Sequence, residues 1–177
     1  MNARHALTAF ALLAAPAYAA TPPATTSTGL DRLAAVLPGT WKSVGEGYAT
    51  QFTQAGKVDY TTFRDCWREG EEFKCVFVVN RKLQLFSIFD WNAADGVYHE
   101  SQITVQGPSP VFNITVKDNV WTYNQDGQDK QGNVYHYRIV RTYTSPTSAD
   151  FLNEYSLDGK TWVTLEKGTE KRVDAGG

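Results

Sequence analysis

Three charged residues in the C-terminal third of the sequence, Arg138, Arg141 and Glu154, are suited to hold the polar end of a ligand. An arginine and a carboxylate form a directional, charge-assisted pair. Residues three apart on a β-strand point to opposite faces, so we expect one of the two arginines to point inward and to pair with Glu154. Such a pair would either orient a polar ligand group in a cavity or form a structural ion pair at the rim.

Large aromatic side chains are the candidates for an apolar ligand surface: Trp41, Trp121, Tyr123 and Trp162. Aromatic walls suit apolar ligands, but the same side chains also fill protein interiors, and the sequence does not separate the two roles. Together with the arginine–glutamate pair, these aromatic residues are the predicted ligand-binding set.

Histidine chemistry was the other possibility for this chain. After the first twenty residues the sequence contains two histidines, His99 and His136. Imidazole is a common metal ligand, but Glu100, next to His99, would point to the opposite face of a strand. Ser101 shares a face with His99, yet no acid that would orient the histidine is evident. The sequence therefore predicts neither a metal site nor a catalytic residue.

The two cysteines of the chain, Cys66 and Cys75, lie in the stretch FRDCWREGEEFKCVF at 63–77. Gly70-Glu71 can form a two-residue type II′ hairpin turn, which prefers Gly at its first position. Cys66 then faces Cys75 at a non-hydrogen-bonded pair, where side chains lie closest and a disulfide is sterically reasonable. A like-charged pair of glutamates beside the turn leaves open a turn that is one residue longer.

Other roles for the cysteines fit less well. A structural zinc site needs four ligands, commonly in closely spaced pairs, whereas eight residues separate these cysteines and no second pair exists. The C-x-x-C pattern of redox centres is absent as well. We predict a disulfide between Cys66 and Cys75, with two free buried thiols as the alternative.

The N-terminal stretch MNARHALTAFALLAAPAYAA has the pattern of a secretory signal peptide. Arg4 precedes an apolar run from Ala6 to Ala15, and small residues form an A-x-A site that ends at Ala19. The run is too short to span a bilayer comfortably. We predict a signal peptide at 1–19 and a periplasmic or secreted location in a bacterium, where a disulfide can persist. A buried N-terminal helix is the alternative.

The charge balance argues against polyanionic partners. The full chain has a formal charge of −2, and removal of Arg4 makes it −3, from 16 basic and 19 acidic residues. We expect no nucleic-acid partner, no electrostatic grip on anionic membranes and no membrane-spanning segment in the mature chain. Residues 20–29, rich in Pro, Thr and Ser, predict a disordered linker, followed by one domain at 30–173. The oligomeric state stays open.

After one short helix, the domain is predicted to be all-β. Leu30, Leu33 and Leu37 have helical spacing, and Pro38-Gly39 ends that helix. Turn signals then recur about every ten residues, and the runs between them are rich in Val, Ile, Thr and aromatic residues. The hairpin around Asp118-Asn119 is the clearest, with one apolar and one polar face.

The predicted strand 134–141 places Tyr and Ile on one face and His, Arg and Val on the other. A sandwich would hide fewer charges, whereas a barrel with a partly polar lumen tolerates them. We expect nine or ten strands between Thr40 and Arg172, closed as an up-and-down antiparallel barrel that leaves no exposed edge.

Four stretches together resemble bacterial lipocalin-like families of unknown function in the calycin group: PGTW (38–41), FDWNAADGVYHES (89–101), VKDNVWTY (116–123) and NEYSLDGKTW (153–162). Such domains often start with a short helix, an L-x-G-x-W entry to the first strand and a late hairpin of the form E-x-S-x-D-G-x-x-W. The resemblance implies a closed barrel with an internal cavity, and no agreed activity.

The segment GTWKSVGEGYATQF (39–52) is also similar to the entry strand of nitrobindin, the haem-carrying barrel, with Ser43 where a Gly is usual. Haem in that family needs an axial histidine late in the chain. The last histidine here is His136, and the final predicted strand, 161–172, has none. We therefore expect no haem and no other cofactor.

From these features we expect an exported lipocalin-like barrel that binds a small, largely apolar molecule in its lumen without chemistry. One alternative is a small-barrel enzyme, such as a cyclase, isomerase or hydrolase, built on the same cavity. The other is a solidly packed structural or partner-binding protein of the cell envelope. A lumen cavity lined by Arg and Glu, or a pair of facing titratable groups with shifted pKa, would discriminate among them.

Overall fold

The computed structural model describes residues 29–129 and 131–173. Its regular elements are one helix and eleven strands: α1 (Gly29–Val36), β1 (Gly39–Gly47), β2 (Gly56–Glu69), β3 (Glu72–Val79), β4 (Lys82–Asn92), β5 (Val97–Thr104), β6 (Gly107–Pro108), β7 (Phe112–Lys117), β8 (Val120–Gln128), β9 (Val134–Ser145), β10 (Ser148–Ser156) and β11 (Val163–Val173). The predicted signal peptide and residues 20–28 of the predicted linker lie outside the described residues.

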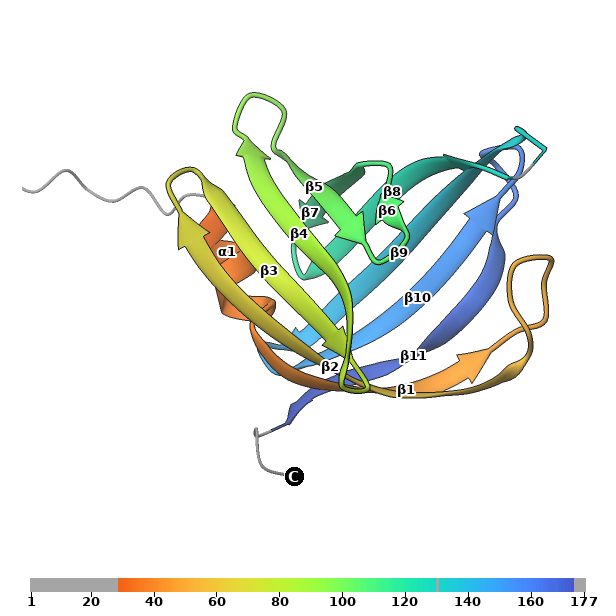
Figure 1. The fold of residues 1–177 in the computed structure, drawn as a ribbon, viewed down its shortest axis with the longest axis horizontal. Helices are drawn as coiled ribbons and strands as arrows, with labels where there is room; N and C mark the ends of the chain where they lie inside the picture. The colour runs from red at the N-terminus through yellow and green to blue at the C-terminus, as the bar shows by residue number, and fades with distance from the viewer. Residues whose placement is uncertain (1–28, 130, 174–177) are drawn as a thin grey trace, which may run out of the picture.

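The strands form a closed antiparallel barrel (Figure 1). Its order around the wall is β4-β3-β2-β1-β11-β10-β9-β8-β7-β5, and pairing of β4 with β5 closes the ring. The two-residue β6 pairs with the end of β5 outside this ring of ten. The predicted all-β barrel of nine or ten strands with a short N-terminal helix is thus confirmed.

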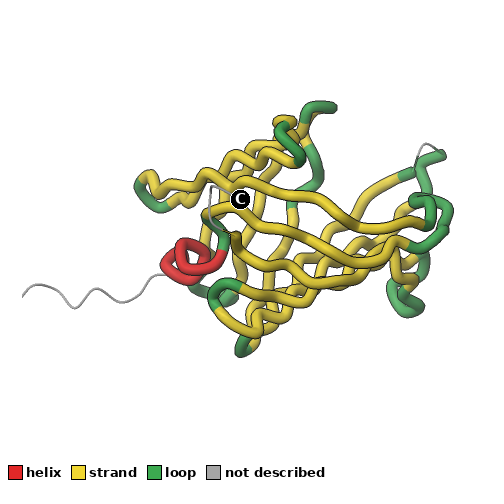
Figure 2. The backbone as a smooth tube through the Cα atoms, turned by 90° about the horizontal axis from the view of Figure 1, so that it is seen from below, coloured by secondary structure: helices red, strands yellow, loops and turns green. Residues whose placement is uncertain are grey.

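Helix α1 lies against one end of the barrel (Figure 2). Leu30, Leu33 and Leu37 are 2%, 0% and 3% exposed, so the helical spacing seen in the sequence is the buried stripe. The Trp41 indole Nε1 donates to the Leu37 carbonyl at 3.2 Å, which ties the helix end to β1. The helix therefore plugs this end. No helix among the described residues is long and apolar enough to cross a membrane.

The β2–β3 hairpin has the predicted register. Glu69 pairs with Glu72 across Gly70-Glu71, and Cys66 pairs with Cys75. Gly70 has a φ of +61°, a value that glycine adopts without steric cost, as the first position of a type II′ turn requires. The longer turn is thereby excluded. The β7–β8 hairpin likewise has the predicted two-residue turn, with Lys117 opposite Val120.

Strands β1 and β11 approach unusually closely where Gly45 faces Gly168. A Cβ on Gly45 would lie 2.7 Å from the Cα of Gly168 and would collide with a backbone carbonyl of β11. Only residues without a side chain allow this contact, so the two glycines set the local approach of the first and last strands of the barrel.

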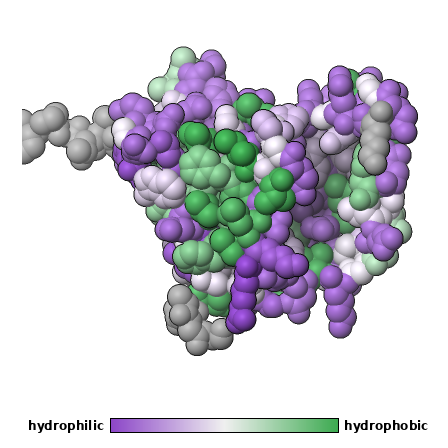
Figure 3. Space-filling view, viewed as in Figure 1, coloured by the Kyte–Doolittle hydropathy of each residue, from purple (hydrophilic) through white to green (hydrophobic). Residues whose placement is uncertain are grey.

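The two faces of the wall differ in composition. Opposed residues of paired strands share a face, so lumen-facing positions can be followed around the ring. On the outer face of β2 to β4, Phe63, Trp67 and Leu83 are 44%, 41% and 58% exposed, and apolar side chains gather over β3 and β4 (Figure 3). This part of the wall therefore carries exposed apolar side chains on its outer face, whereas its inner face includes Arg64.

Candidate ligand-binding site in the barrel lumen

The lumen contains a cavity of about 260 Å³. Its wall comes from seven strands of the ring and from the residue that follows α1. The lining residues are Leu37, Tyr60, Thr62, Arg64, Phe77, Val79, Gln84, Leu85, Phe89, Glu100, Gln102, Tyr123, Ile139, Arg141 and Glu170. The cavity is therefore part apolar and part charged.

A buried ionic cluster occupies one side of this cavity. The Arg64 Nη2 atom donates to both carboxylate oxygens of Glu170, at 3.4 and 3.3 Å. The Arg141 Nε atom donates to Oε2 of the same carboxylate at 3.2 Å, and the Ser43 hydroxyl donates to Oε1 at 3.3 Å. Arg64 and Glu170 are 4% and 1% exposed and Arg141 is 17% exposed, so two guanidinium groups share one buried carboxylate.

The electrostatics of the cluster keep Glu170 ionised. Burial alone would raise its pKa, but the opposing charges of Arg141 and Arg64 and their hydrogen bonds outweigh burial and lower the pKa to about 2. For Arg141, burial would lower the pKa, and Glu170 instead raises it well above its usual value. The cluster thus carries two positive charges and one negative charge across the physiological pH range.

Glu100 lies elsewhere in the wall, on β5. It is 3% exposed. Its Oε1 atom accepts hydrogen bonds from the Ser87 hydroxyl at 2.7 Å and from Gln102 Nε2 at 2.8 Å. Burial raises the pKa of Glu100 against the opposing effect of these two bonds. Two carboxyl groups of one cavity therefore have pKa values shifted in opposite directions.

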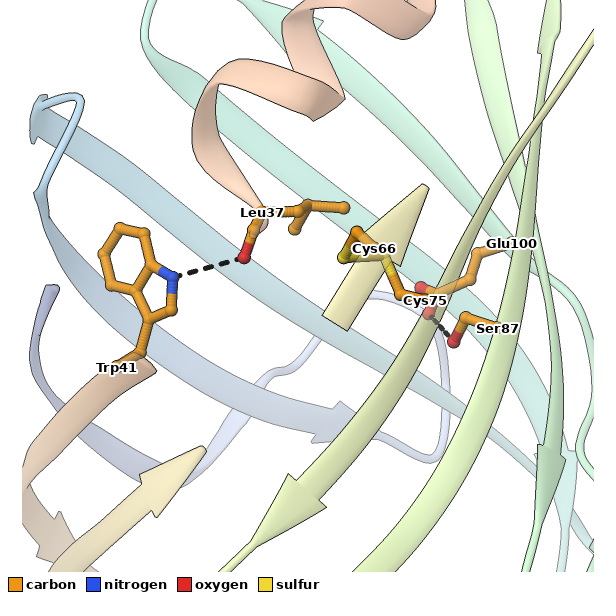
Figure 4. Close-up of a disulfide and its surroundings, with 6 residues drawn as sticks. All are labelled: Leu37, Trp41, Cys66, Cys75, Ser87 and Glu100. Atoms are coloured by element: carbon orange, nitrogen blue, oxygen red, sulfur yellow. Dashed lines mark hydrogen bonds between the residues drawn. A yellow bond between two sulfur atoms is a disulfide. The ribbon is translucent and has the colours of Figure 1, made fainter. Parts of the chain in front are cut away.

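The predicted disulfide is confirmed: Cys66 and Cys75 are bonded. Figure 4 shows the disulfide together with Leu37 and Glu100, which line the cavity, and with Ser87 of β4, which pairs with Cys75. Cys75 is fully buried. The bond therefore joins β2, which carries Arg64, to β3, which carries Phe77, and it braces the wall between them.

Of the predicted aromatic residues, Tyr123 lines the cavity. Trp41 and Trp121 are 0% and 4% exposed and pack with Tyr143 near the plugged end, outside the cavity lining. Trp41 still contributes to the site indirectly, because the Arg64 guanidinium lies over its ring at 5.2 Å. Its position holds Arg64 in place.

Glu154 was expected to pair with the inward-pointing arginine, but it pairs with Arg138, which points outward, and Arg138 Nε donates to Glu154 Oε2 at 2.7 Å. The Arg138 guanidinium also lies 3.9 Å from the centre of the Trp162 ring. Arg138 is on the opposite face of β9 from Arg141, and it is Arg141 that lines the cavity. Arg138, Glu154 and Trp162 thus form a separate cluster on the outer face of the barrel, away from the lumen.

Three charged residues of the site were missing from the sequence-based prediction: Arg64, Glu100 and Glu170. For Arg64 the alternation of side chains along a strand gave a usable signal. Arg64 lies two residues from Cys66 and therefore on the same face of the hairpin. The pairing of Ser43 with Glu170 depends instead on the register of β1 and β11, which are distant in sequence.

The two histidines each pair with an aspartate away from the cavity. His99 Nδ1 lies 3.0 Å from Asp90, and His136 Nδ1 lies 2.7 Å from Asp126. Within residues 29–129 and 131–173, no group of three or more metal-binding side chains comes together.

The comparisons with known proteins support the fold. No family model matches the sequence, and no curated protein matches it. The crystal structure of Rv2717c from M. tuberculosis is similar over 81% of this chain and 96% of that one, with a TM-score of 0.51 and 10% sequence identity. The structure of EF1p2_mFAP2b bound to DFHBI covers 80% of this chain and 98% of that one at 18% identity, but its TM-score of 0.34 is too low to carry an argument. At these identities the likeness concerns the barrel fold alone.

Proposed function

We propose that the protein binds a small molecule with a largely apolar body in the lumen of its barrel, without catalysing a reaction. The observation that carries the proposal is the lumen cavity, whose wall contains apolar side chains such as Phe77, Leu85 and Ile139 beside a few fixed polar groups. Apolar walls with a small number of placed polar groups are the usual composition of small-molecule sites.

The size of the cavity limits the ligand. An apolar cavity of roughly 150 Å³ accepts one benzene ring. On that scale the cavity of about 260 Å³ accommodates a molecule of about ten heavy atoms. A solidly packed barrel would have no space of this kind, so the cavity favours a binding role over a purely structural one. The resemblance to lipocalin-like families agrees with an internal cavity and adds no activity of its own.

A small-barrel enzyme is the second candidate, on the basis of one observation. Glu100 and Glu170 line the same cavity with pKa values shifted in opposite directions, an arrangement that acid–base enzymes use. Glu170, however, is engaged by two arginines and a serine. The hydroxyl next to Glu100, that of Ser87, donates to the carboxylate and is not among the residues that line the cavity. Turnover of a bound molecule that disappears in Glu100→Gln while binding persists would favour the enzyme.

We also infer that the protein is exported, with cleavage near Ala19. The inference rests on the signal-peptide pattern of residues 1–19, and the Cys66–Cys75 disulfide supports an oxidising compartment. N-terminal sequencing of protein isolated from the periplasm or medium would give Ala20 as the first residue. Recovery of the full-length chain from the cytoplasm alone would contradict this.

The binding proposal is tested by calorimetric titration with two neutral probes of suitable size, toluene and 1-hexanol. Ile139→Trp adds bulk to the cavity wall and should abolish binding. Val140→Trp adds slightly more bulk to the opposite face of β9, where Val140 pairs with Thr122 and Leu152, and should leave binding unchanged. Binding that survives Ile139→Trp in a folded variant would place the ligand outside the lumen.

A further inference from the structure

Hydrogen-bond donors without partners gather on the charged side of the lumen cavity. Arg64 Nε and Nη1 and the Tyr123 hydroxyl are buried and have no hydrogen-bond partner among the described residues. Within the same residues, Arg141 donates one hydrogen bond, from Nε, so its two Nη groups remain available. A buried donor without a partner is costly, and a bound ligand can remove that cost.

These donors surround a common region. Both arginines contact Glu170, and the Arg141 guanidinium lies 5.2 Å from the centre of the Tyr123 ring. Two guanidinium groups face one ionised carboxylate, and the burial of Glu100 favours its uncharged form. The region is therefore rich in donors and electropositive whenever Glu100 is protonated.

We propose that the lumen ligand carries a carboxylate, which accepts hydrogen bonds from Arg141 and from the Tyr123 hydroxyl while its apolar part lies along Phe77, Leu85 and Ile139. This inference rests on the proposed binding function. A carboxylate offers about four acceptor sites and matches the fork of a guanidinium group. A single carboxylate can accept from the Tyr123 hydroxyl and from the Nη groups of Arg141 at once.

Other head groups fit the site less well. An amine would lie next to two guanidinium groups of the same charge. It would also bring more donors to a region that already has those of Arg64, Arg141 and Tyr123 and that lacks acceptors. A phosphate dianion would add two negative charges next to Glu170, and its size would use much of a cavity of about 260 Å³. A neutral hydroxyl would leave most of the donors unpaired. A protonated Glu100 can itself donate to a carboxylate, so its presence in the wall does not oppose the assignment.

The test compares hexanoate with 1-hexanol, which have the same chain length and differ in the head group, by calorimetry at pH 6. We expect hexanoate to bind at least about ten-fold more tightly, since hydrogen bonds to a charged group are stronger than neutral ones. Tyr123→Phe should reduce this ratio several-fold. Tyr143→Phe is the matched control, because the Tyr143 hydroxyl is also buried without a partner but lies outside the cavity lining, and it should leave the ratio unchanged.

The outcomes separate the two proposals. Binding of 1-hexanol with no preference for hexanoate would overturn the carboxylate assignment and leave the lumen function standing. Binding of neither compound would overturn both. A preference that both tyrosine variants weaken equally would overturn the placement of the carboxylate at Tyr123.

Discussion

Replacing Glu170 by glutamine would leave the guanidinium groups of Arg64 and Arg141 buried beside a neutral amide. Removal of one partner from a buried ion pair costs about 3–5 kcal/mol, because the remaining charge is left uncompensated. The shift of the Glu170 pKa from 4.5 to about 2 corresponds to a similar figure, on the order of 3 kcal/mol at neutral pH. We therefore expect Glu170→Gln to lower the free energy of unfolding by about 3 kcal/mol.

Urea unfolding at pH 7 with the disulfide intact measures this loss. The pH dependence gives a second check. Because the folded-state pKa of Glu170 is lowered, its stabilising contribution is present above pH 4.5 and is lost as the pH falls toward 2. The difference between wild type and Glu170→Gln should therefore narrow between pH 5 and pH 2. The control is Asp59→Asn, which breaks an ion pair to Lys42 whose side chains are 63% and 39% exposed and should cost about 1 kcal/mol or less.

The reasoning would be refuted by either of two results. One is a Glu170→Gln loss no larger than that of Asp59→Asn. The other is a wild-type-to-variant difference that stays constant across the acid range, since that would mean that the carboxylate is not held ionised by the arginines.

The remaining predictions concern stability. Glu100→Gln should become more stable relative to wild type as the pH rises from 4.5 toward 8, as measured by urea unfolding. Burial raises the folded-state pKa of Glu100, so the wild type loses stability when this carboxyl group ionises. A difference in the free energy of unfolding that does not change with pH would contradict this. Loss of the Cys66–Cys75 bond in the double alanine variant should lower the free energy of unfolding by about 2–3 kcal/mol, and an unchanged urea midpoint would count against the bracing role. Gly168→Ala should cost more than about 2 kcal/mol, because its Cβ would meet the backbone of β1. Gly56→Ala, with no atom within 4 Å of the added Cβ, should change the thermal midpoint little, and equal effects of the two substitutions would be inconsistent with the close approach of β1 and β11.

Local geometry was the part of the fold that the sequence revealed best. The register of the Cys66–Cys75 hairpin follows from Gly70 and a count of residues, because a two-residue turn fixes every pair behind it. The helix over Gly29–Val36 follows from the spacing of its leucines. Both depend on neighbours within about ten residues of each other, where the sequence has direct information.

Turn signals in the sequence were misleading where contacts with neighbouring strands determine the backbone conformation. Asp126-Gly127 has a turn signal, yet both residues lie inside β8, and a Cβ on Gly127 would collide with the Tyr135 ring of the neighbouring strand. Gly127 is thus explained by close packing rather than by a turn. The turn that joins β3 to β4 is formed by Asn80 and Arg81 with φ values of 49° and 66°, and an arginine gives no sequence signal for that conformation.

The charged site was only partly predictable. The sequence indicated that one of Arg138 and Arg141 points inward. Which one does so depends on which set of alternate residues of the strand faces the lumen, and in the structure Arg141 lines the cavity. Its partner is Glu170 rather than Glu154. Arg64 and Glu170 are 106 residues apart in the sequence. They lie close together because their strands, β2 and β11, both pair with β1. No local pattern reports such a contact.

The most direct test of the lumen-binding account is a crystal structure of the protein with 6-bromohexanoate, measured at the bromine absorption edge. The account predicts an anomalous peak inside the barrel near Leu85 and Ile139, with the carboxylate at Arg141 and Tyr123. A lumen without bromine at saturating ligand, or bromine found on the outer surface alone, would contradict it.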